Sequence, residues 1–142
     1  MNNLEMFCLT LEPDHYDFIT GLGYQPVGLG NQNFNKNWFT DKNDINISKK
    51  NKNYGEYTFH YWIWKNYLNK IENNWIGFCQ YRKFWTIKKI ETENIDFNTL
   101  KESVLNKIPD KYDNFESIIG EPFYVNQFRF SKFIKRNLKT MI

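Results

Sequence analysis

The sequence predicts an α/β fold built on a mainly parallel sheet. Two apolar runs, Glu5–Thr10 and the WIGFCQY run inside residues 74–85, have the length and composition of buried strands, the second of them central. Helical patterns lie between and after these runs, and strands that alternate with helices are typical of βαβ units. A chain of 142 residues can bury one core. We therefore expect a single domain over residues 1–142 with three or four mainly parallel strands.

The segment between the two runs divides into a loop and a helix. Residues 21–52 are rich in Gly, Asn, Asp and Lys, with isolated apolar side chains, which predicts an ordered binding loop with a short strand near Pro26–Leu29. Asn53 and Glu56 have the spacing of a capping box, so a helix is expected over Tyr54–Leu68. Its apolar residues surround the helix axis, which predicts a crossover helix buried on most sides.

The second half of the chain is expected to hold two more helices and a third strand. Apolar residues recur with helical spacing from Leu100 to Ile108, and Pro109 ends this pattern. Phe115–Ile119 has the composition of a strand. Residues 127–142 place apolar side chains on one helical face. A half-exposed packing helix is the main interpretation of that segment, and peripheral contact with a membrane is the alternative.

Charge and composition exclude several classes of protein. A hydrophobic share of 41% supports a folded core, and a dispersed net charge of +3 argues against a nucleic-acid partner. No run approaches the roughly 20 apolar residues that cross a bilayer, and the N-terminus lacks a signal-peptide pattern. Cys8 and Cys79 lie in apolar runs and are expected to be buried free thiols. These features predict a cytoplasmic protein.

Two polar groups lie where ligands bind in open α/β sheets, near the carboxyl ends of strands. The first runs from Asn46 and Ser48 to the start of the expected helix, whose unpaired N–H groups can receive an anion. In the second, a strand end brings two cations and a phenol together. Arginine can bind phosphate oxygens through two parallel hydrogen bonds, and lysine adds a point charge. This second group consists of Gln80, Tyr81, Arg82 and Lys83.

One stretch of the sequence resembles a known family. It reads NISKKNKNYGEYTFHYWIWKN followed by WIGFCQYRKFW, and it is similar to the signature of domain-of-unknown-function family 4422 (DUF4422), a glycosyltransferase-like family of bacterial capsular and exopolysaccharide loci. The likeness covers approximately Cys8 to Trp85 and is looser beyond. The matching positions are Asn46, Ser48, Asn53, Tyr54, Glu56, Thr58, Tyr61, Trp62, Trp64, Lys65, Asn66, Gly77, Tyr81, Arg82 and Phe84.

Three positions depart from the family pattern. Ile45 stands where the family usually has Asp, and Asp44 lies one place earlier. Gln80 replaces a common His, which removes an imidazole from the strand end. Lys83 replaces a second Arg and keeps the charge without the planar fork. The chain also spans about half of a GT-A-like enzyme, so the resemblance implies a domain that is incomplete at its C-terminal side.

The resemblance implies an abbreviated GT-A-like (Rossmann-like) α/β domain, with helices flanking the sheet. Its implied activity is transfer of a sugar from a nucleotide-sugar donor to a saccharide acceptor. A lipid-linked acceptor would place this activity at the cytoplasmic face of the membrane. The sequence has no Asp-x-Asp motif, so no metal ligands are expected, and cations would neutralise the leaving diphosphate. No catalytic residue is assigned. The expected substrate-binding residues are Asn46, Ser48, Asn53, Tyr54, Glu56, Gln80, Tyr81, Arg82 and Lys83.

Several candidates also have a purely structural interpretation. The aromatic residues of the expected helix, such as Trp62 and Trp64, fit a core better than a sugar site. Glu56 fits a helix cap, His60 a hydrogen-bonded structural residue, and His15 a solvated loop residue. For the whole chain, the alternative function is a noncatalytic nucleotide- or carbohydrate-binding remnant of such an enzyme.

Overall fold

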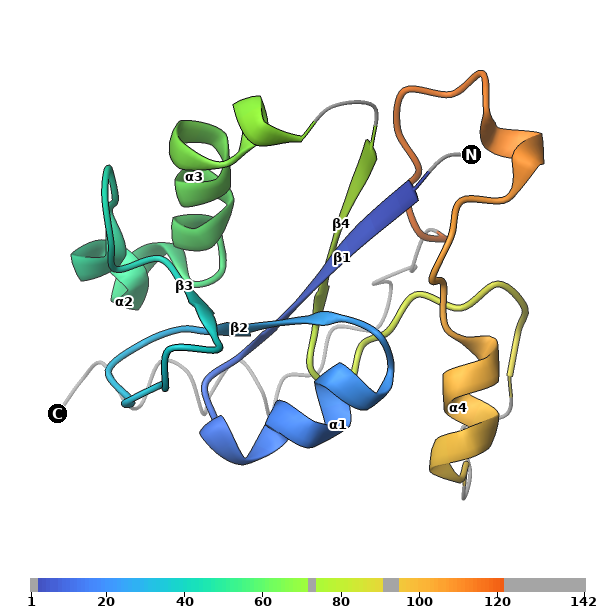
Figure 1. Cartoon of the computed structure of the whole chain (residues 1–142), viewed down its shortest axis with the longest axis horizontal. Helices are drawn as coiled ribbons and strands as arrows, with labels where there is room; N and C mark the ends of the chain where they lie inside the picture. Colours follow the sequence, from blue (N-terminus) through green and yellow to red (C-terminus); the bar gives the residue numbers. More distant parts are fainter. Residues whose placement is uncertain (1–2, 72–73, 91–94, 122–142) are drawn as a thin grey trace, which may run out of the picture.

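The computed structural model describes residues 3–71, 74–90 and 95–121. Four strands form one sheet in the order β3-β2-β1-β4, and every neighbouring pair is parallel (Figure 1). This confirms the expected α/β class, a small Rossmann-like fold with a parallel sheet. The strands are β1 (Asn3–Thr10), β2 (Gln25–Gly28), β3 (Phe39–Thr40) and β4 (Asn74–Gln80).

Strand β1 is buried on both of its faces. Its side chains alternate, so that Met6 and Cys8 face one side of the sheet while Phe7 and Leu9 face the other. All four are buried, as in parallel sheets whose two faces are both covered. The prediction that β4 is central is wrong for the described residues, where β4 is the outermost strand and pairs with β1. The apolar composition of β4 arises because side chains on both of its faces pack in the core clusters, and not because a strand pairs with it on each edge.

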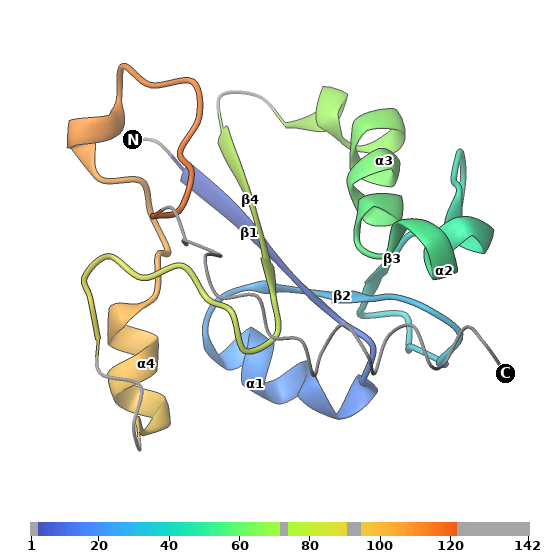
Figure 2. The same cartoon turned by 180° about the vertical axis from the view of Figure 1, so that it is seen from behind.

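Helices cover both faces of the sheet (Figures 1 and 2). On one face, Ile19 of α1 and Leu100 of α4 pack in the cluster that contains Met6 and Cys8. On the other, Phe59 of α3 packs in the cluster that contains Phe7. The helices are α1 (Tyr16–Gly21), α2 (Asn51–Tyr54), α3 (Tyr57–Asn66) and α4 (Phe97–Ser103), with single 3-10 turns η1 (Pro13–His15), η2 (Ser48–Lys50), η3 (Leu68–Lys70) and η4 (Asp110–Tyr112).

Phe7 lies at the centre of a cluster of aromatic rings that joins three strands to α3. Its ring centroid is 5.3 Å from that of Phe39, 5.5 Å from Phe59, 6.0 Å from Tyr67 and 5.9 Å from Phe78. Phe7 and Phe59 are both 0% exposed. Aromatic pairs at such spacings contribute about 0.5–1.5 kcal/mol each beyond area burial. This cluster therefore accounts for much of the attachment of α3 to the sheet.

The continuous helix expected over Tyr54–Leu68 is wrong, because the chain breaks at Gly55. α2 ends at Tyr54, Gly55 has φ 55° and ψ −131°, and α3 begins at Tyr57. That backbone conformation belongs to glycine and not to residues with a Cβ. The capping box is also wrong, because Asn53 lies inside α2 and the Glu56 side chain caps nothing at the start of α3.

Burial on most sides of this helix is wrong as well. The buried residues of α3 are Thr58, Phe59, Trp62 and Ile63, which form one face. The opposite side is open, since Tyr57 is 64% exposed and Trp64 is 57% exposed. The aromatic residues of α3 therefore form two faces, one buried in the core and one exposed. On the exposed face, the Lys65 ammonium lies 3.4 Å from the centroid of the Trp64 ring.

Residues 21–52 form an ordered connection, as predicted. The expected short strand is β2, and its Gly28 lies beneath Phe34, whose ring would clash with a Cβ at that position. The additional strand β3 was not predicted, because two residues are too few to leave a pattern. Trp38, just before β3, is buried and anchors the loop.

The predictions for the second half were less accurate. The helix is α4, which begins after an Asp96 cap and ends at Ser103, where Val104 turns to φ −71° and ψ 152°. The helical spacing of apolar residues up to Ile108 therefore extends beyond the helix itself, which ends at Ser103. Phe115–Ile119 is not a strand, and its Phe115 and Ile119 are exposed. The helix expected over 127–142 lies outside the described residues. No described helix has the length and apolar character to span a membrane.

Candidate functional site

The carboxyl end of β4 is closed by a tight turn that carries two cations. The Lys83 amide donates to the Gln80 carbonyl at 2.8 Å, and Arg82 has φ 72°. A positive φ at the third residue is the feature of type II turns, where glycine is usual. An arginine in the left-handed region costs about 1–2 kcal/mol, a cost that occurs preferentially at functional sites.

This turn is held against the connection after β1. The Tyr81 ring stacks on the His15 ring with centroids 3.5 Å apart and an interplanar angle of 10°. His15 Nδ1 lies 2.7 Å from Thr10 Oγ1, which also accepts a hydrogen bond from the Glu12 amide at 3.1 Å. The expectation that His15 is a solvated loop residue is therefore wrong. Its ring is half-buried and links the carboxyl ends of β1 and β4.

Glu56 reaches the same strand end from the other side of the sheet. The Gln80 side-chain amide donates to the Glu56 carboxylate. Glu56 is in this position because the chain turns at Gly55, just before α3. The interpretation of Glu56 as a helix cap is thus replaced by a contact between α3 and β4. Gln80, at the position where the family commonly has His, is the residue that makes this contact.

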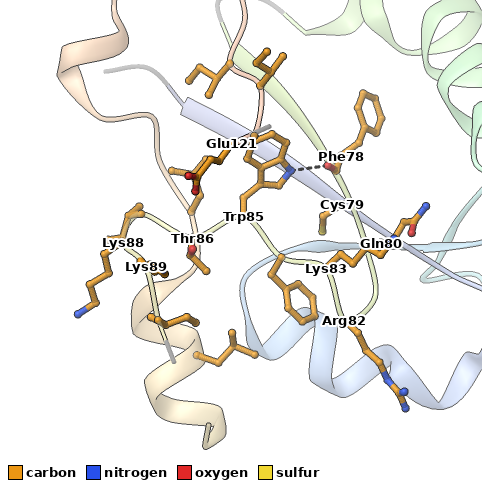
Figure 3. A pocket seen from close by; sticks show the side chains of 18 of the residues that line it. Phe78, Cys79, Gln80, Arg82, Lys83, Trp85, Thr86, Lys88, Lys89 and Glu121 are labelled. Carbon is orange, nitrogen blue, oxygen red and sulfur yellow. Dashed lines mark hydrogen bonds between the residues drawn. The ribbon is translucent and has the colours of Figure 1, made fainter. Parts of the chain in front are cut away.

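A cleft of about 1200 Å³ runs past the end and the outer side of β4. Figure 3 shows Gln80, Arg82 and Lys83 at one end of it and Lys88 and Lys89 at the other, with Trp85 between them. The Trp85 indole N–H donates to the Phe78 carbonyl at 2.8 Å, which fixes the ring against β4. The charged residues of the lining are Glu56, Arg82, Lys83, Lys88, Lys89, Lys111 and Glu121. Cations therefore predominate among the described residues of the lining, and this charge suits an anion.

Arg82 and Lys83 are the two cations of this turn. Within residues 3–71, 74–90 and 95–121, neither Arg82 nor Lys83 makes an ion pair or a side-chain hydrogen bond. Arg82 does lie near the Tyr81 ring, with 5.7 Å from its Cζ to the ring centroid. Both side chains are exposed. Unpaired guanidinium and ammonium groups on one turn can bind the oxygens of a diphosphate.

His60 adds an imidazole to this cleft. It lies one helical turn after Glu56, lines the cleft, and packs its ring 4.2 Å from that of Phe78. Burial lowers the pKa of His60, and the Glu56 carboxylate opposes this shift in part. The ring is thus held neutral near pH 7, and a neutral imidazole can accept a proton. An imidazole is therefore present at the site although position 80 lacks one.

Acid should destabilise the wild-type protein more than it destabilises His60→Gln. The lowered folded-state pKa means that the unfolded chain binds the proton first, so stability falls as the pH drops below about 6.5, the ordinary value of histidine. Urea unfolding at pH 7.5 and pH 5 measures this difference, and the carboxylates common to both proteins cancel in the comparison. Equal losses of unfolding free energy in the two proteins would contradict a lowered pKa for His60.

Five of the nine predicted substrate-binding residues lie outside the lining of the cleft. Asn46 organises its own loop, because its Nδ2 donates to the carbonyls of Lys42 and Asp44 and its Oδ1 accepts from the Ser48 hydroxyl. The same loop is attached to the far end of α3, where the Asn66 side chain bonds the Ile45 backbone. The cleft residues thus include Glu56, Gln80, Arg82 and Lys83 from the prediction but not Asn46, Ser48, Asn53, Tyr54 or Tyr81.

Sequence reasoning missed several lining residues. His60 was interpreted as structural, although the Glu56 and His60 spacing of i and i+4 could have placed both on one helical face. Lys88 and Lys89 follow a strand by several residues and carry no motif. Among the described residues, no three His, Cys, Asp or Glu side chains come together as a metal-binding group.

The parallel sheet, with its cleft at the carboxyl end of β4, defines the class as a small Rossmann-like α/β domain. A sequence model of the family described as "Domain of unknown function (DUF4422)" matches residues 9–135. The chain therefore belongs to the DUF4422 family, as its motifs predicted, and this family is associated with glycosyltransferase-like proteins. Comparison with curated proteins and with solved structures gives no match.

Proposed function

We propose that the protein binds a nucleotide sugar at the carboxyl end of β4 and transfers its sugar to a saccharide acceptor in bacterial surface-polysaccharide synthesis. The observation that carries this proposal is the turn at Arg82 and Lys83. Both cations line the cleft without an anionic partner among the described residues, and Arg82 holds a strained backbone conformation. Strain and unpaired charge at the ligand-binding edge of a parallel sheet favour a ligand site over a stabilising surface pair.

In this proposal the donor diphosphate lies on Arg82 and Lys83. The two cations stabilise the negative charge that grows on the diphosphate as its bond to the sugar breaks. The Glu56 carboxylate and the Gln80 amide, already bonded to each other, face the same space and suit the hydroxyl groups of the sugar. His60 accepts the proton of the acceptor hydroxyl as the new glycosidic bond forms.

The acceptor occupies the opposite end of the cleft. There Lys88 and Lys89 stand beside Ile87 and Ile90, so charge and apolar surface are adjacent. That combination fits an acceptor with both a phosphate and an apolar chain, which is the chemistry of a lipid-linked saccharide. Donor and acceptor then meet near Trp85, between the two groups of cations.

Nucleotide sugars should raise the melting temperature of the protein. A ligand at 100 times its Kd stabilises the folded state by about 2.7 kcal/mol, which corresponds to a rise of roughly 10 °C for a domain of this size. A thermal-shift screen with UDP-, GDP-, CMP- and dTDP-sugars measures it. Because Arg82 and Lys83 supply the positive charge, the shift should survive EDTA. A shift that requires Mg²⁺ or Mn²⁺ would contradict the proposal that Arg82 and Lys83 bind the diphosphate without a metal ion.

The same protein distinguishes an enzyme from a noncatalytic binding remnant. An enzyme should release the nucleotide of the stabilising donor (UDP, GDP or dTDP, or CMP from a CMP-sugar) when acceptor or water is present. His60→Gln should slow this release by roughly 10²–10⁴-fold while keeping the thermal shift. Binding without release of the nucleotide would favour the remnant. No stabilisation by any donor would remove the proposal.

A further inference from the structure

The two cysteines of the chain lie directly opposite each other in the sheet. Cys8 of β1 and Cys79 of β4 are register partners, so both side chains leave the sheet on the same face. Both belong to the cluster that also contains Met6 and Tyr24. Neighbouring strands lie about 4.8 Å apart, and disulfides span Cα separations of about 4.4–6.8 Å. The Cα separation expected of register partners therefore falls within the range that one disulfide spans.

The pair is buried but is reached from the cleft through one of its members. Cys8 is 0% exposed and Cys79 is 6% exposed. Cys79 lines the cleft, and Figure 3 shows its side chain leaving β4 on the side opposite to those of Phe78 and Gln80. A small oxidant that enters the cleft therefore meets the Cys79 sulfur first, with the Cys8 thiol directly behind it.

We propose that Cys8 and Cys79 form an oxidation site, at which a small hydroperoxide converts the two thiols into a disulfide between β1 and β4. This inference does not depend on the proposed glycosyltransferase function. It differs from the simpler interpretation of two buried apolar side chains, because it requires the two sulfurs to react together and in a fixed order.

The reaction balances with hydrogen peroxide as the oxidant. The Cys79 thiolate attacks one peroxide oxygen, the O–O bond breaks, and the departing hydroxide takes a proton to become water, which leaves a sulfenic acid on Cys79. The Cys8 sulfur then loses its proton and attacks Cys79. The S–O bond breaks, and a second water leaves. Two thiols are oxidised and one peroxide is reduced to two waters.

The environment of the pair makes this reaction slow at neutral pH. A hydrogen bond with Cys8, together with burial, raises the pKa of the Cys79 thiol. Because the thiolate is the reactive form, the rate of thiol loss should rise with pH, by up to about tenfold per pH unit. An exposed cysteine with an ordinary pKa of about 8.5 would stop gaining rate near pH 9.

Hydrogen peroxide treatment of the full chain tests the inference. The reduced, folded protein is incubated with peroxide between pH 7 and pH 10, unfolded in acid, and examined by intact mass and thiol titration. Both thiols should disappear together, with loss of two hydrogen atoms, and dithiothreitol should restore them. The chain has only 2 cysteines, so an intramolecular disulfide in a monomer can only join Cys8 to Cys79.

Two single variants provide the matched controls. In Cys8→Ala, Cys79 should gain oxygen atoms or form an intermolecular disulfide, and in Cys79→Ala the deeply buried Cys8 should resist oxidation. If a variant fails to fold, the intact mass of the oxidised wild type still shows whether a disulfide has formed, through the loss of two hydrogen atoms. The proposal is overturned if wild-type Cys79 gains oxygen while Cys8 keeps its thiol, or if both thiols survive at pH 10 in folded protein.

Discussion

Phe7→Ala should lower the free energy of unfolding by about 3–5 kcal/mol, the usual cost of truncating a buried aromatic side chain. Phe7 is 0% exposed and its ring contacts four others, so the surrounding strands and α3 cannot close the space that it leaves. Domains of this kind are stable by about 5–15 kcal/mol in total. The variant should therefore melt far below the wild type or populate unfolded chain at 37 °C.

Urea unfolding of Phe7→Ala measures this loss, provided that the slope of the transition is unchanged. Phe115→Ala is the matched control, because Phe115 is 57% exposed and its removal should cost no more than about 0.5 kcal/mol. A loss below about 1 kcal/mol in Phe7→Ala would show that the ring cluster is not the main attachment of α3.

Arg82→Gly should weaken nucleotide-sugar binding by about 10–100-fold while leaving the fold no less stable. The loss corresponds to about 1.5–3 kcal/mol for a hydrogen bond to a charged group. Glycine adopts the φ of 72° without strain, so the variant removes the guanidinium and the backbone cost together. Calorimetric titration with the donor found in the thermal-shift screen measures the affinity, and thermal unfolding measures the stability.

Two further variants serve as controls for Arg82→Gly. Arg82→Lys keeps a cation and the strain but loses the planar fork, so its affinity should lie between those of wild type and Arg82→Gly. Lys101→Ala removes an exposed lysine of α4 that does not line the cleft, and it should bind the donor as the wild type does. Equal binding by wild type and Arg82→Gly would place the diphosphate elsewhere.

The parts of the fold that could be predicted are those fixed by apolar pattern. β1 and β4 were found because each is a short apolar run, and parallel pairing is the arrangement expected of strands that alternate with helices. The break before α3 could not be predicted in this way. A positive φ at Gly55 is a property of one residue, whereas the aromatic pattern on both sides of it continues as if the helix did.

The residues of the candidate site also fall into those that the sequence could predict and those that it could not. Gln80, Arg82 and Lys83 could be placed because Gln80 ends a strand and the other two follow it, and ligands bind at strand ends in open α/β sheets. His60 and Glu56 depend on how α3 packs against β4, which spacing alone does not reveal. The apolar residues of Phe115–Ile119 matched strand composition, but composition does not supply a neighbouring strand to pair with.

The contacts that shape the cleft also protect the rim of the sheet from other copies of the chain. Outermost strands expose backbone groups on which a second molecule can align and begin to aggregate. In β4 the carbonyls of Phe78 and Gln80 are already occupied, by the Trp85 indole and the Lys83 amide. These two carbonyls at the carboxyl end of β4 are therefore not available as acceptors for a strand of another copy.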